Sequence, residues 1–428
     1  MQSKKQFCNL ISRIISRAAT AALAIAAVFA LTVVLTQPAQ AQTFKVLHTF
    51  TGGADGAEPG AGLTIDKAGN LYGTATYGGS YGNGTVFKLS HKGSGWVFTL
   101  PYSFRGLPDG ANPEAALVFG PDGRLYGTTF LGGVKDCYYG METCGTVFNL
   151  RPAASACKTA LCLWTETVLY RFTGGIDSAS NPGGLAFDPA GNMYISTGNQ
   201  QEQQIVVELV PSNGGWQETL SCVIRDSDGN ISGVTLDAAG NLYAVDAGGG
   251  AYDQGFVFQL TGPPCTQNIL YSFQGGTDGI NPQGSLIFDN VGNLYGTAYG
   301  SGEGGGGTVF ELSPSNGNWT FSLLYSFTGA GGSGASLTMD AAGKLYGTTC
   351  GDGAYEHGSV FKLTPSGGSW TYSSLHDFTG GSDGACPWSN VTFDANGNLY
   401  GTTADGGDTS GDCHGLLGCG VVWEITFP

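Results

Sequence analysis

Seven copies of one short segment recur along the chain, and this repetition limits the possible folds more than any other feature. The clearest copies read Asp-x-x-Gly-Asn-Leu-Tyr, and looser copies vary a few of these positions. Their tyrosines lie 49 to 68 residues apart, at Tyr72, Tyr126, Tyr194, Tyr243, Tyr295, Tyr346 and Tyr400. A period of this length is typical of a propeller blade with its loops.

Each copy predicts four strands. The first is a short apolar run such as 286–288, and it ends at the Asp-x-x-Gly-Asn turn, where glycine can adopt the left-handed conformation of a tight hairpin. The second strand is the Asn-Leu-Tyr-Gly-Thr-Thr segment, and the third follows a glycine-rich loop, as in 84–89. In the fourth, as in 319–327, large residues take every second position, so we expect one face to pack between blades.

The two ends of the repeat array predict that it closes into a ring. Residues 44–50 match a fourth strand but have no first strand before them, and residues 420–425 match a third strand with no fourth after them. Pairing these segments completes one blade and removes a free sheet edge. We therefore predict an all-β fold in which residues 42–428 form a seven-bladed β-propeller closed by an N-terminal strand.

Residues 1–41 are predicted to be a secretory signal peptide. Four basic residues precede an apolar run at 18–35, and small residues follow at Ala39 and Ala41. This order is typical of a signal peptide cleaved before Gln42. The alternative is an uncleaved anchor, because the run nearly reaches the roughly 20 residues that span a bilayer. We expect a secreted or periplasmic protein with no membrane contact after cleavage.

The mature chain is strongly acidic. Cleavage removes four of the 17 basic residues and none of the 33 acidic ones, which leaves 13 against 33 and changes the net charge from −16 to −20. Such a surface repels phosphate backbones and anionic lipids, which argues against nucleic acid and membrane-surface partners. It is compatible with cations or neutral ligands, and we expect a monomer.

The ten cysteines that follow the signal peptide predict disulfides, because an exported chain folds in an oxidising compartment. Cys350 and Cys386 are expected on one face of adjacent blades, and Cys222 and Cys265 on outer strands of neighbouring blades. The remaining candidates lie close together in sequence: Cys137 with Cys144, Cys157 with Cys162, and Cys413 with Cys419.

The repeat motifs resemble those of the GloVer tandem repeat family of exported bacterial proteins. Residues 270–279, 295–297 and 307–312 closely match three family motifs, and the resemblance covers nearly all of 44–428. It implies a propeller-like repeat protein and no particular activity. A second resemblance, to NHL or gluconolactonase-like propellers, rests on 234–243 alone. It would imply a lactonase- or lyase-type enzyme with a metal in the channel.

Two sets of acidic residues are candidate ligands. The loops from each fourth strand to the next first strand share one face and carry Asp55, Asp109, Asp177, Asp228, Asp278 and Asp383. These carboxylates could hold a cation or a polar ligand; alternatively, each accepts hydrogen bonds from its own turn. Asp226, Asp228, Asn230 and Asp237 partly match a calcium loop, although Ile231 replaces its glycine. Calcium is the only cofactor that the sequence suggests.

The sequence contains no nucleophile elbow, zinc-binding histidine pair or phosphate-binding Gly-Lys motif, so we assign no catalytic residue. His48 and His376 take the fourth-strand position that holds tyrosine elsewhere, and we expect them to pack within the repeat. A non-catalytic binding or scaffold module is therefore favoured over an enzyme.

A ligand site is predicted over copy one. The longest loops between second and third strands, 130–144 and 405–419, belong to copies two and seven, which flank copy one in a closed ring. Exposed aromatic rings beside aspartate and asparagine suit a carbohydrate or a peptide; alternatively, the rings pack their own loops. The candidate binding residues are Tyr77, Tyr81, Tyr138, Tyr139 and Trp388, with Asp55, Asp109 and Asp383.

Overall fold

The computed structural model describes residues 42–93, 95–135, 143–152, 164–174, 182–198, 204–213, 215–262, 265–300, 305–329, 331–332, 334–411, 413 and 417–427. Residues 44–425 form one compact unit, and the described residues of a second unit are 42–43 and 426–427. Within the described chain, no helix is long and apolar enough to cross a membrane. The predicted signal peptide at 1–41 lies outside the described residues.

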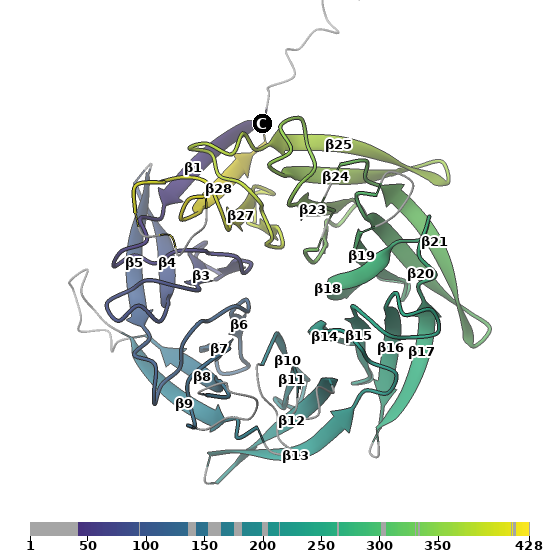
Figure 1. Cartoon of the computed structure of the whole chain (residues 1–428), viewed down its shortest axis with the longest axis horizontal. Helices are drawn as coiled ribbons and strands as arrows, with labels where there is room; N and C mark the ends of the chain where they lie inside the picture. The colour runs from purple at the N-terminus through teal and green to yellow at the C-terminus, as the bar shows by residue number, and fades with distance from the viewer. Residues whose placement is uncertain are drawn as a thin grey trace, which may run out of the picture. The chain divides into compact units, whose positions relative to one another are not determined.

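The unit 44–425 is a ring of seven antiparallel sheets, each with four strands (Figure 1). Blade one contains β2 (Thr64–Ile65), β3 (Leu71–Ala75), β4 (Thr85–Lys92) and β5 (Gly95–Ser103). Blade two contains β6 (Val118–Phe119), β7 (Leu125–Thr129), β8 (Thr146–Arg151) and β9 (Thr165–Arg171). Blade three contains β10 (Leu185–Phe187), β11 (Met193–Gly198), β12 (Gln204–Ser212) and β13 (Gly215–Val223).

The other blades follow the same order from the centre outward. Blade four contains β14 (Ile231–Leu236), β15 (Leu242–Asp246), β16 (Phe256–Thr261) and β17 (Thr266–Ser272). Blade five contains β18 (Ile280–Phe288), β19 (Leu294–Gly300), β20 (Thr308–Ser315) and β21 (Asn318–Ser326). Blade six contains β22 (Thr338–Met339), β23 (Leu345–Thr349), β24 (Ser359–Ser366) and β25 (Ser369–Asp377). The predicted seven-bladed propeller is confirmed.

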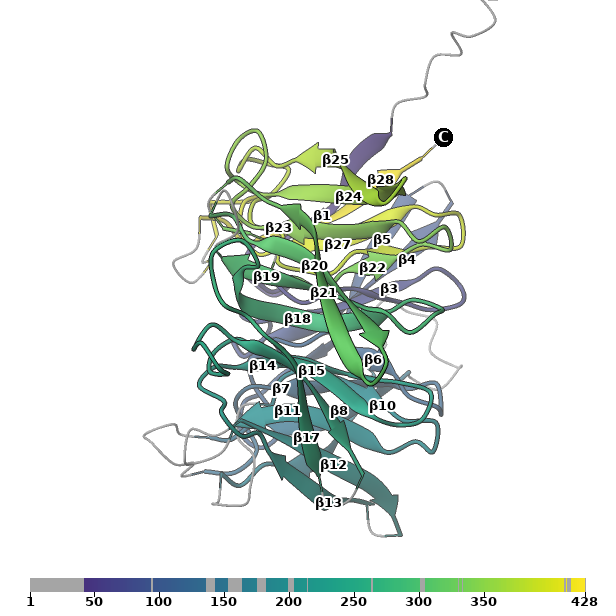
Figure 2. The same ribbon diagram turned by 90° about the vertical axis from the view of Figure 1, so that its right-hand side faces the viewer.

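Blade seven joins the two ends of the repeat array, as the strand count predicts. It contains β26 (Thr392–Phe393), β27 (Leu399–Thr403), β28 (Val421–Thr426) and β1 (Thr43–Thr49), in the order β1-β28-β27-β26. The Phe50 backbone N–H donates to the Gly420 carbonyl at 3.0 Å. The purple strand β1 lies beside the yellow strand β28 in Figures 1 and 2. The N-terminal strand therefore covers the edge that β28 would otherwise expose.

The Asp-x-x-Gly-Asn segment forms the turn between the first two strands of a blade. In blade one the Asp66 carboxylate accepts the backbone N–H groups of Ala68 and Asn70, both at 2.9 Å. The hydroxyl of Tyr72 donates to the same carboxylate at 2.9 Å. Gly69 adopts the left-handed conformation that the turn requires, with a φ of 79°. The repeated motif is therefore structural.

Threonine hydroxyls connect the inner strands of neighbouring blades. In blade one Thr64 donates to the Leu117 carbonyl of blade two, and Thr74 donates to Ala115 at 3.3 Å. At the closing junction Thr392 donates to Leu63 at 2.5 Å, and Thr402 donates to Ala61 at 3.0 Å. The bonds of Thr392 and Thr402 fasten blade seven to blade one at the centre of the ring.

The fourth strands form a second set of contacts at the outside of the ring, on the face that the alternating pattern predicts. Ring pairs join blades four to five, five to six, six to seven and seven to one: Tyr271–Phe321 (4.4 Å between centroids), Tyr325–Tyr372 (4.6 Å), His376–Phe44 (3.6 Å) and His48–Phe98 (3.7 Å). Both histidines pack in the repeat, as predicted. Between blades three and four the corresponding residue is Cys222, which bonds to Cys265.

Candidate functional site

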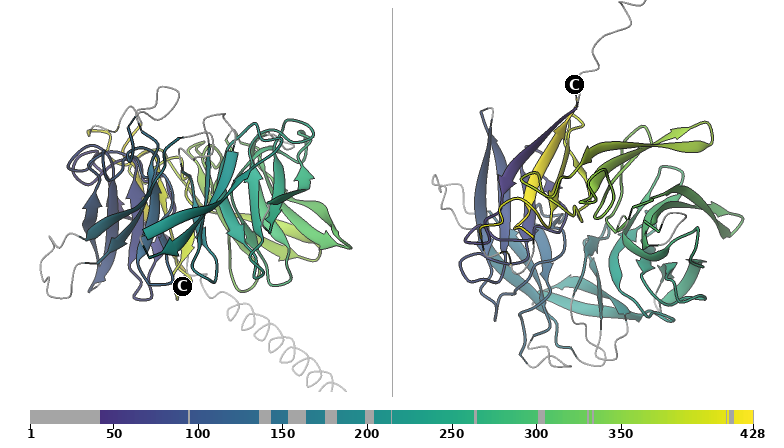
Figure 3. Two further views of the ribbon diagram at one scale, coloured as in Figure 1. Left: turned by 90° about the horizontal axis from the view of Figure 1, so that it is seen from below. Right: turned by 45° about the horizontal axis from the view of Figure 1, so that its top comes forward.

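The inner ends of the seven blades surround a channel with a volume of about 750 Å³. Each blade contributes residues that precede its first strand, and most of these residues are small, such as Ala61 and Gly62 before Leu63. Small side chains leave the centre open, and this volume lies in the range of small-molecule sites. The loops that follow fourth and second strands meet at one end of the channel, which we call the mouth; Figure 3 shows loops gathered at both ends of the blades.

Two aromatic side chains stack at the mouth. The rings of Trp388, from blade seven, and Tyr299, from blade five, have centroids 5.5 Å apart and planes 26° apart. Trp388 is 39% exposed. Between them, a Cβ at Gly334 of blade six would lie 2.7 Å from Gln283 Oε1 and 3.3 Å from the Trp388 ring. Glycine at 334 therefore leaves space for both side chains, so three blades build this platform.

The mouth is acidic. Burial raises the pKa of Glu58 to about 7, and the negative charges of Glu114 and Asp405 contribute to this shift. Burial also raises the pKa of Glu114 and of Asp405. Glu114 is the only charged side chain among the described residues that line the channel. The Glu114 carboxyl group in the lining disfavours an anionic ligand.

The predicted loop aspartates bind their own turns. Asp55 accepts the Thr51 backbone N–H at 3.1 Å and contacts His48 at 3.2 Å. Asp109, Asp278 and Asp383 accept the backbone N–H of the residue four positions earlier, at 3.0, 2.8 and 3.0 Å. None of the four lines the channel. These four carboxylates therefore accept hydrogen bonds from their own turns, which was the alternative to ligand binding. Asp177 lies outside the described residues.

The calcium candidates do not come together as a ligand set. Asp237 belongs to the repeat turn, where it accepts the backbone N–H groups of Ala239 and Asn241, both at 2.9 Å. Asn230 accepts a bond from Gln204 at 3.5 Å. Over the described residues, no three His, Cys, Asp or Glu side chains are grouped to hold a metal ion, so Asp226, Asp228 and Asp237 form no such group.

Of the aromatic residues predicted to form a groove over copy one, Tyr77 and Tyr81 lie in one loop of blade one, and Trp388 lies in the loop that leads into blade seven. Tyr81 is 56% exposed on its loop, and the Arg105 guanidinium carbon lies 5.8 Å from its ring centroid. The backbone of Tyr77 pairs with Ala57 at the base of the same loop. Trp388 instead stacks on Tyr299 at the mouth. Tyr138 and Tyr139 lie outside the described residues.

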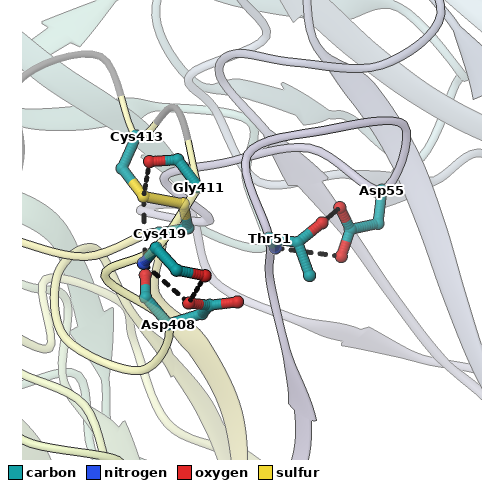
Figure 4. The surroundings of a disulfide bond; sticks show 7 residues. Thr51, Asp55, Asp408, Gly411, Cys413 and Cys419 are labelled. Carbon is teal, nitrogen blue, oxygen red and sulfur yellow. Dashed lines mark hydrogen bonds between the residues drawn. A yellow bond between two sulfur atoms is a disulfide. The ribbon is translucent and has the colours of Figure 1, made fainter.

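The Cys413–Cys419 disulfide lies in the long loop 405–419 of copy seven, and Figure 4 shows this loop beside the turn that joins Thr51 to Asp55. The Cys419 carbonyl accepts the Glu58 backbone N–H at 3.1 Å. The loop of copy seven therefore borders copy one, as predicted. The pairs Cys350–Cys386 and Cys222–Cys265 are also formed. Cys144 is disulfide-bonded, whereas Cys137, Cys157 and Cys162 lie outside the described residues.

Sequence reasoning missed Tyr299, Gln283 and Glu114. Their signal is a departure from the repeat: Gln283 and Glu114 occupy the position that holds glycine at Gly334 of copy six. Tyr299 lies near the end of the second strand, at the position where the last copy has Ala404. Aligning the seven copies and searching for large residues at small positions would have identified all three, together with Trp388.

The model of the Gloeobacter/Verrucomicrobia repeat matches residues 26–232 and 230–418. The chain belongs to this repeat family. The match spans both halves of the ring and confirms the resemblance that the repeated motifs carry. Membership of the Gloeobacter/Verrucomicrobia repeat family accounts for the blade motif and assigns no activity. No protein with curated annotation matches the chain.

Solved structures share the fold at low sequence identity. The chain is similar to the extracellular domain of a protein described as a hybrid two-component system from B. thetaiotaomicron, at 12% identity and a TM-score of 0.53, covering 91% of this chain and 43% of that one. An extracellular domain described as part of a one-component system from the same organism is 13% identical with a TM-score of 0.51. That match covers 90% of this chain and 42% of the other. A gluconolactonase from Xanthomonas campestris is 14% identical with a TM-score of 0.39, and the match covers 66% of this chain and 79% of that one. The chain thus spans less than half of the first two, and the likeness shows the fold alone.

Proposed function

We propose that the protein is an exported, non-catalytic binding module that holds a neutral carbohydrate at the mouth of its central channel. The observation that carries this proposal is the Trp388–Tyr299 platform, which lies beside Gln283 at the entrance to a cavity of about 750 Å³. Most copies of the repeat have smaller residues at these two positions, such as Gly334 and Ala404. The two large rings are therefore not required by the structure of the repeat.

The chemistry of the mouth suits a sugar. A pyranose presents C–H groups that stack on aromatic faces, and its hydroxyls exchange hydrogen bonds with amides. Trp388 and Tyr299 supply the faces, while the side chains of Gln283 and Asn390 supply amide donors and acceptors in the lining. The acidic mouth disfavours a phosphorylated or carboxylated ligand. A neutral carbohydrate satisfies both conditions.

Two features support export to the periplasm or the medium. Three disulfides join described residues, and disulfides persist in oxidising compartments. The segment 1–41 has the basic, apolar and small-residue regions of a signal peptide. We infer that the mature chain begins at Gln42 and meets its ligand outside the cytoplasm.

A competing candidate is an enzyme of lactonase or lyase type. It is favoured by the carboxyl group of Glu58, because a pKa of about 7 suits general acid–base chemistry at neutral pH. Incubating the protein with neutral oligosaccharides and sugar lactones tests it directly. If the wild type turns over one of these compounds and Glu58→Gln does not, the enzyme candidate replaces the binding proposal.

The binding proposal is tested on an array of neutral oligosaccharides, followed by calorimetry with the best probe. We expect Trp388→Ala to weaken binding at least tenfold, since stacking on the ring is lost, and Trp388→Phe to retain most of it. Val291→Ala is the matched control, because Val291 is a 79% exposed apolar residue in a turn at the opposite end of its blade. Failure of the wild type to bind any probe, or equal binding by Trp388→Ala, would refute the proposal.

A further inference from the structure

Three exposed tyrosines recur at one position of the loop between second and third strands. Tyr81, Tyr252 and Tyr355 are 56%, 54% and 57% exposed, and they belong to blades one, four and six. Each lies three residues before the glycine that precedes its third strand. Single exposed aromatic residues are common on protein surfaces. Recurrence of the same residue at the same loop position in three blades indicates a shared role.

The three loops hold their tyrosines with the same backbone geometry. The residue after each tyrosine is left-handed, with φ values of 77° at Gly82, 56° at Asp253 and 60° at Glu356. The carbonyl of the following residue accepts a backbone N–H from the next blade in all three: Asn83 from Asn112 at 3.0 Å, Gln254 from Asn281 at 3.0 Å, and His357 from Cys386 at 2.9 Å. Each loop is therefore fastened to its neighbouring blade just beyond the tyrosine.

Side chains in the loops hold two of the tyrosine backbones in place. The Asn83 amide donates to the Tyr81 carbonyl at 3.2 Å, and the Gln254 amide donates to the Tyr252 carbonyl at 3.2 Å. More than half of the surface of each tyrosine remains open to solvent. A ring presented by a preorganised loop loses little conformational entropy when it binds, which is why tyrosine is frequent at recognition surfaces.

The three loops surround the mouth of the channel. All are connections between second and third strands, so they lie on the same face of the ring, and Figure 1 shows β3, β15 and β23 on different sides of the channel. Counting around the ring, the tyrosines are three, two and two blades apart. A ligand that touches all three must extend across the face, which indicates a repeating ligand rather than a single small molecule.

We propose that Tyr81, Tyr252 and Tyr355 are three equivalent subsites by which this face binds the surface of a neutral polysaccharide. The inference rests on the proposed carbohydrate function and adds the polymeric class of its ligand. Asp253 and Glu356 directly follow Tyr252 and Tyr355 in the chain, and their negative charges disfavour an anionic polymer at these two loops. A polysaccharide surface repeats its sugar faces, so three weak stacking contacts act together and increase the overall affinity.

The test measures retention of the protein by particles of microcrystalline cellulose, chitin and insoluble β-1,3-glucan. Each single Tyr→Ala variant should lower the affinity for the retaining particle by about three- to tenfold, and the triple variant by roughly 30-fold or more. The triple Tyr→Phe variant should be retained almost like the wild type, because stacking needs the ring and not the hydroxyl. Val291→Ala is the control, and an unchanged melting temperature shows that each variant is folded.

The outcomes separate this inference from the mouth site. The triple Tyr→Ala variant should still bind a soluble neutral oligosaccharide, whereas Trp388→Ala should lose that probe and keep most of its retention by particles. Unchanged retention of the triple Tyr→Ala variant, or no retention of the wild type by any particle, would overturn the inference and leave the mouth site standing. Retention by immobilised peptides through the same tyrosines, with none by polysaccharide, would overturn the assigned ligand.

Discussion

Removing the Cys222–Cys265 disulfide should open the ring locally more than removing Cys350–Cys386 does. Both disulfides join adjacent blades, but the junction between blades three and four lacks the threonine hydrogen bonds and the ring stack that junction six/seven has. Ser196 occupies the position of Thr74, and its buried hydroxyl has no partner among the described residues. Cys222 itself replaces the ring that stacks on the next blade. The disulfide is therefore the main link at the outside of this junction.

The magnitude follows from loop length and from the contacts that remain. The bonded cysteines are 43 and 36 residues apart, so the chain-entropy model predicts a loss of about 4 kcal/mol for either pair. After the cut, junction three/four keeps two bonds between Gln267 and the Arg225 backbone and a long bond of 3.5 Å from Gln204 to Asn230. Junction six/seven keeps the His376–Phe44 stack, the Thr338 and Thr348 bonds, and the backbone bond from residue 386 to the His357 carbonyl. At about 1 kcal/mol for each contact, local opening should be roughly 1–2 kcal/mol easier at junction three/four.

The variants are chosen to keep the backbone unstrained. Cys222→Ala with Cys265→Ser cuts the first pair, and Cys350→Ala with Cys386→Asn cuts the second. Asparagine is chosen because Cys386 has a φ of 49° and the equivalent residues of blades two and five are the left-handed Asn112 and Asn281. Native-state hydrogen exchange should show a larger loss of protection in β13 and β17 in the first variant than in β23 and β25 in the second. Equal losses at the two junctions would refute the reasoning.

Two further predictions concern the closing blade and the acidic mouth. Deleting residues 42–50 removes β1 and exposes β28, so the melting temperature should fall by many degrees, and an unchanged melting curve would contradict closure by this strand. The Glu58 carboxyl group has a pKa of about 7 against an ordinary 4.5, so the folded chain binds the extra proton between these values and its stability falls as the pH rises through them. Glu58→Gln should therefore gain on the order of 1 kcal/mol over the wild type at pH 8 and almost nothing at pH 4, after allowance for solvent screening. Thermal unfolding at both pH values measures the difference, and an equal gain at both would count against the shifted pKa.

The amino-acid sequence by itself determined the architecture of this protein. Strand patterning is local, because side chains alternate between the two faces of a strand, and the Asp-x-x-Gly-Asn turn binds its own backbone. Closure also follows from the sequence, since the copy whose third strand is 420–425 lacks a fourth strand and the surplus strand at 44–50 supplies it. The same repeat alignment placed Cys350 near Cys386 and Cys222 near Cys265.

Only the tertiary structure decided what the loops do. The sequence could not show whether Asp55 faces a ligand or its own turn, because both readings use the same residues, and the hydrogen bond from Thr51 places it in the turn. Nor could it show that Trp388 stacks on Tyr299, since that contact depends on the space above Gly334 in a third blade. Contacts of this kind join residues that are far apart in the chain, and their geometry is set by how the blades pack around the channel.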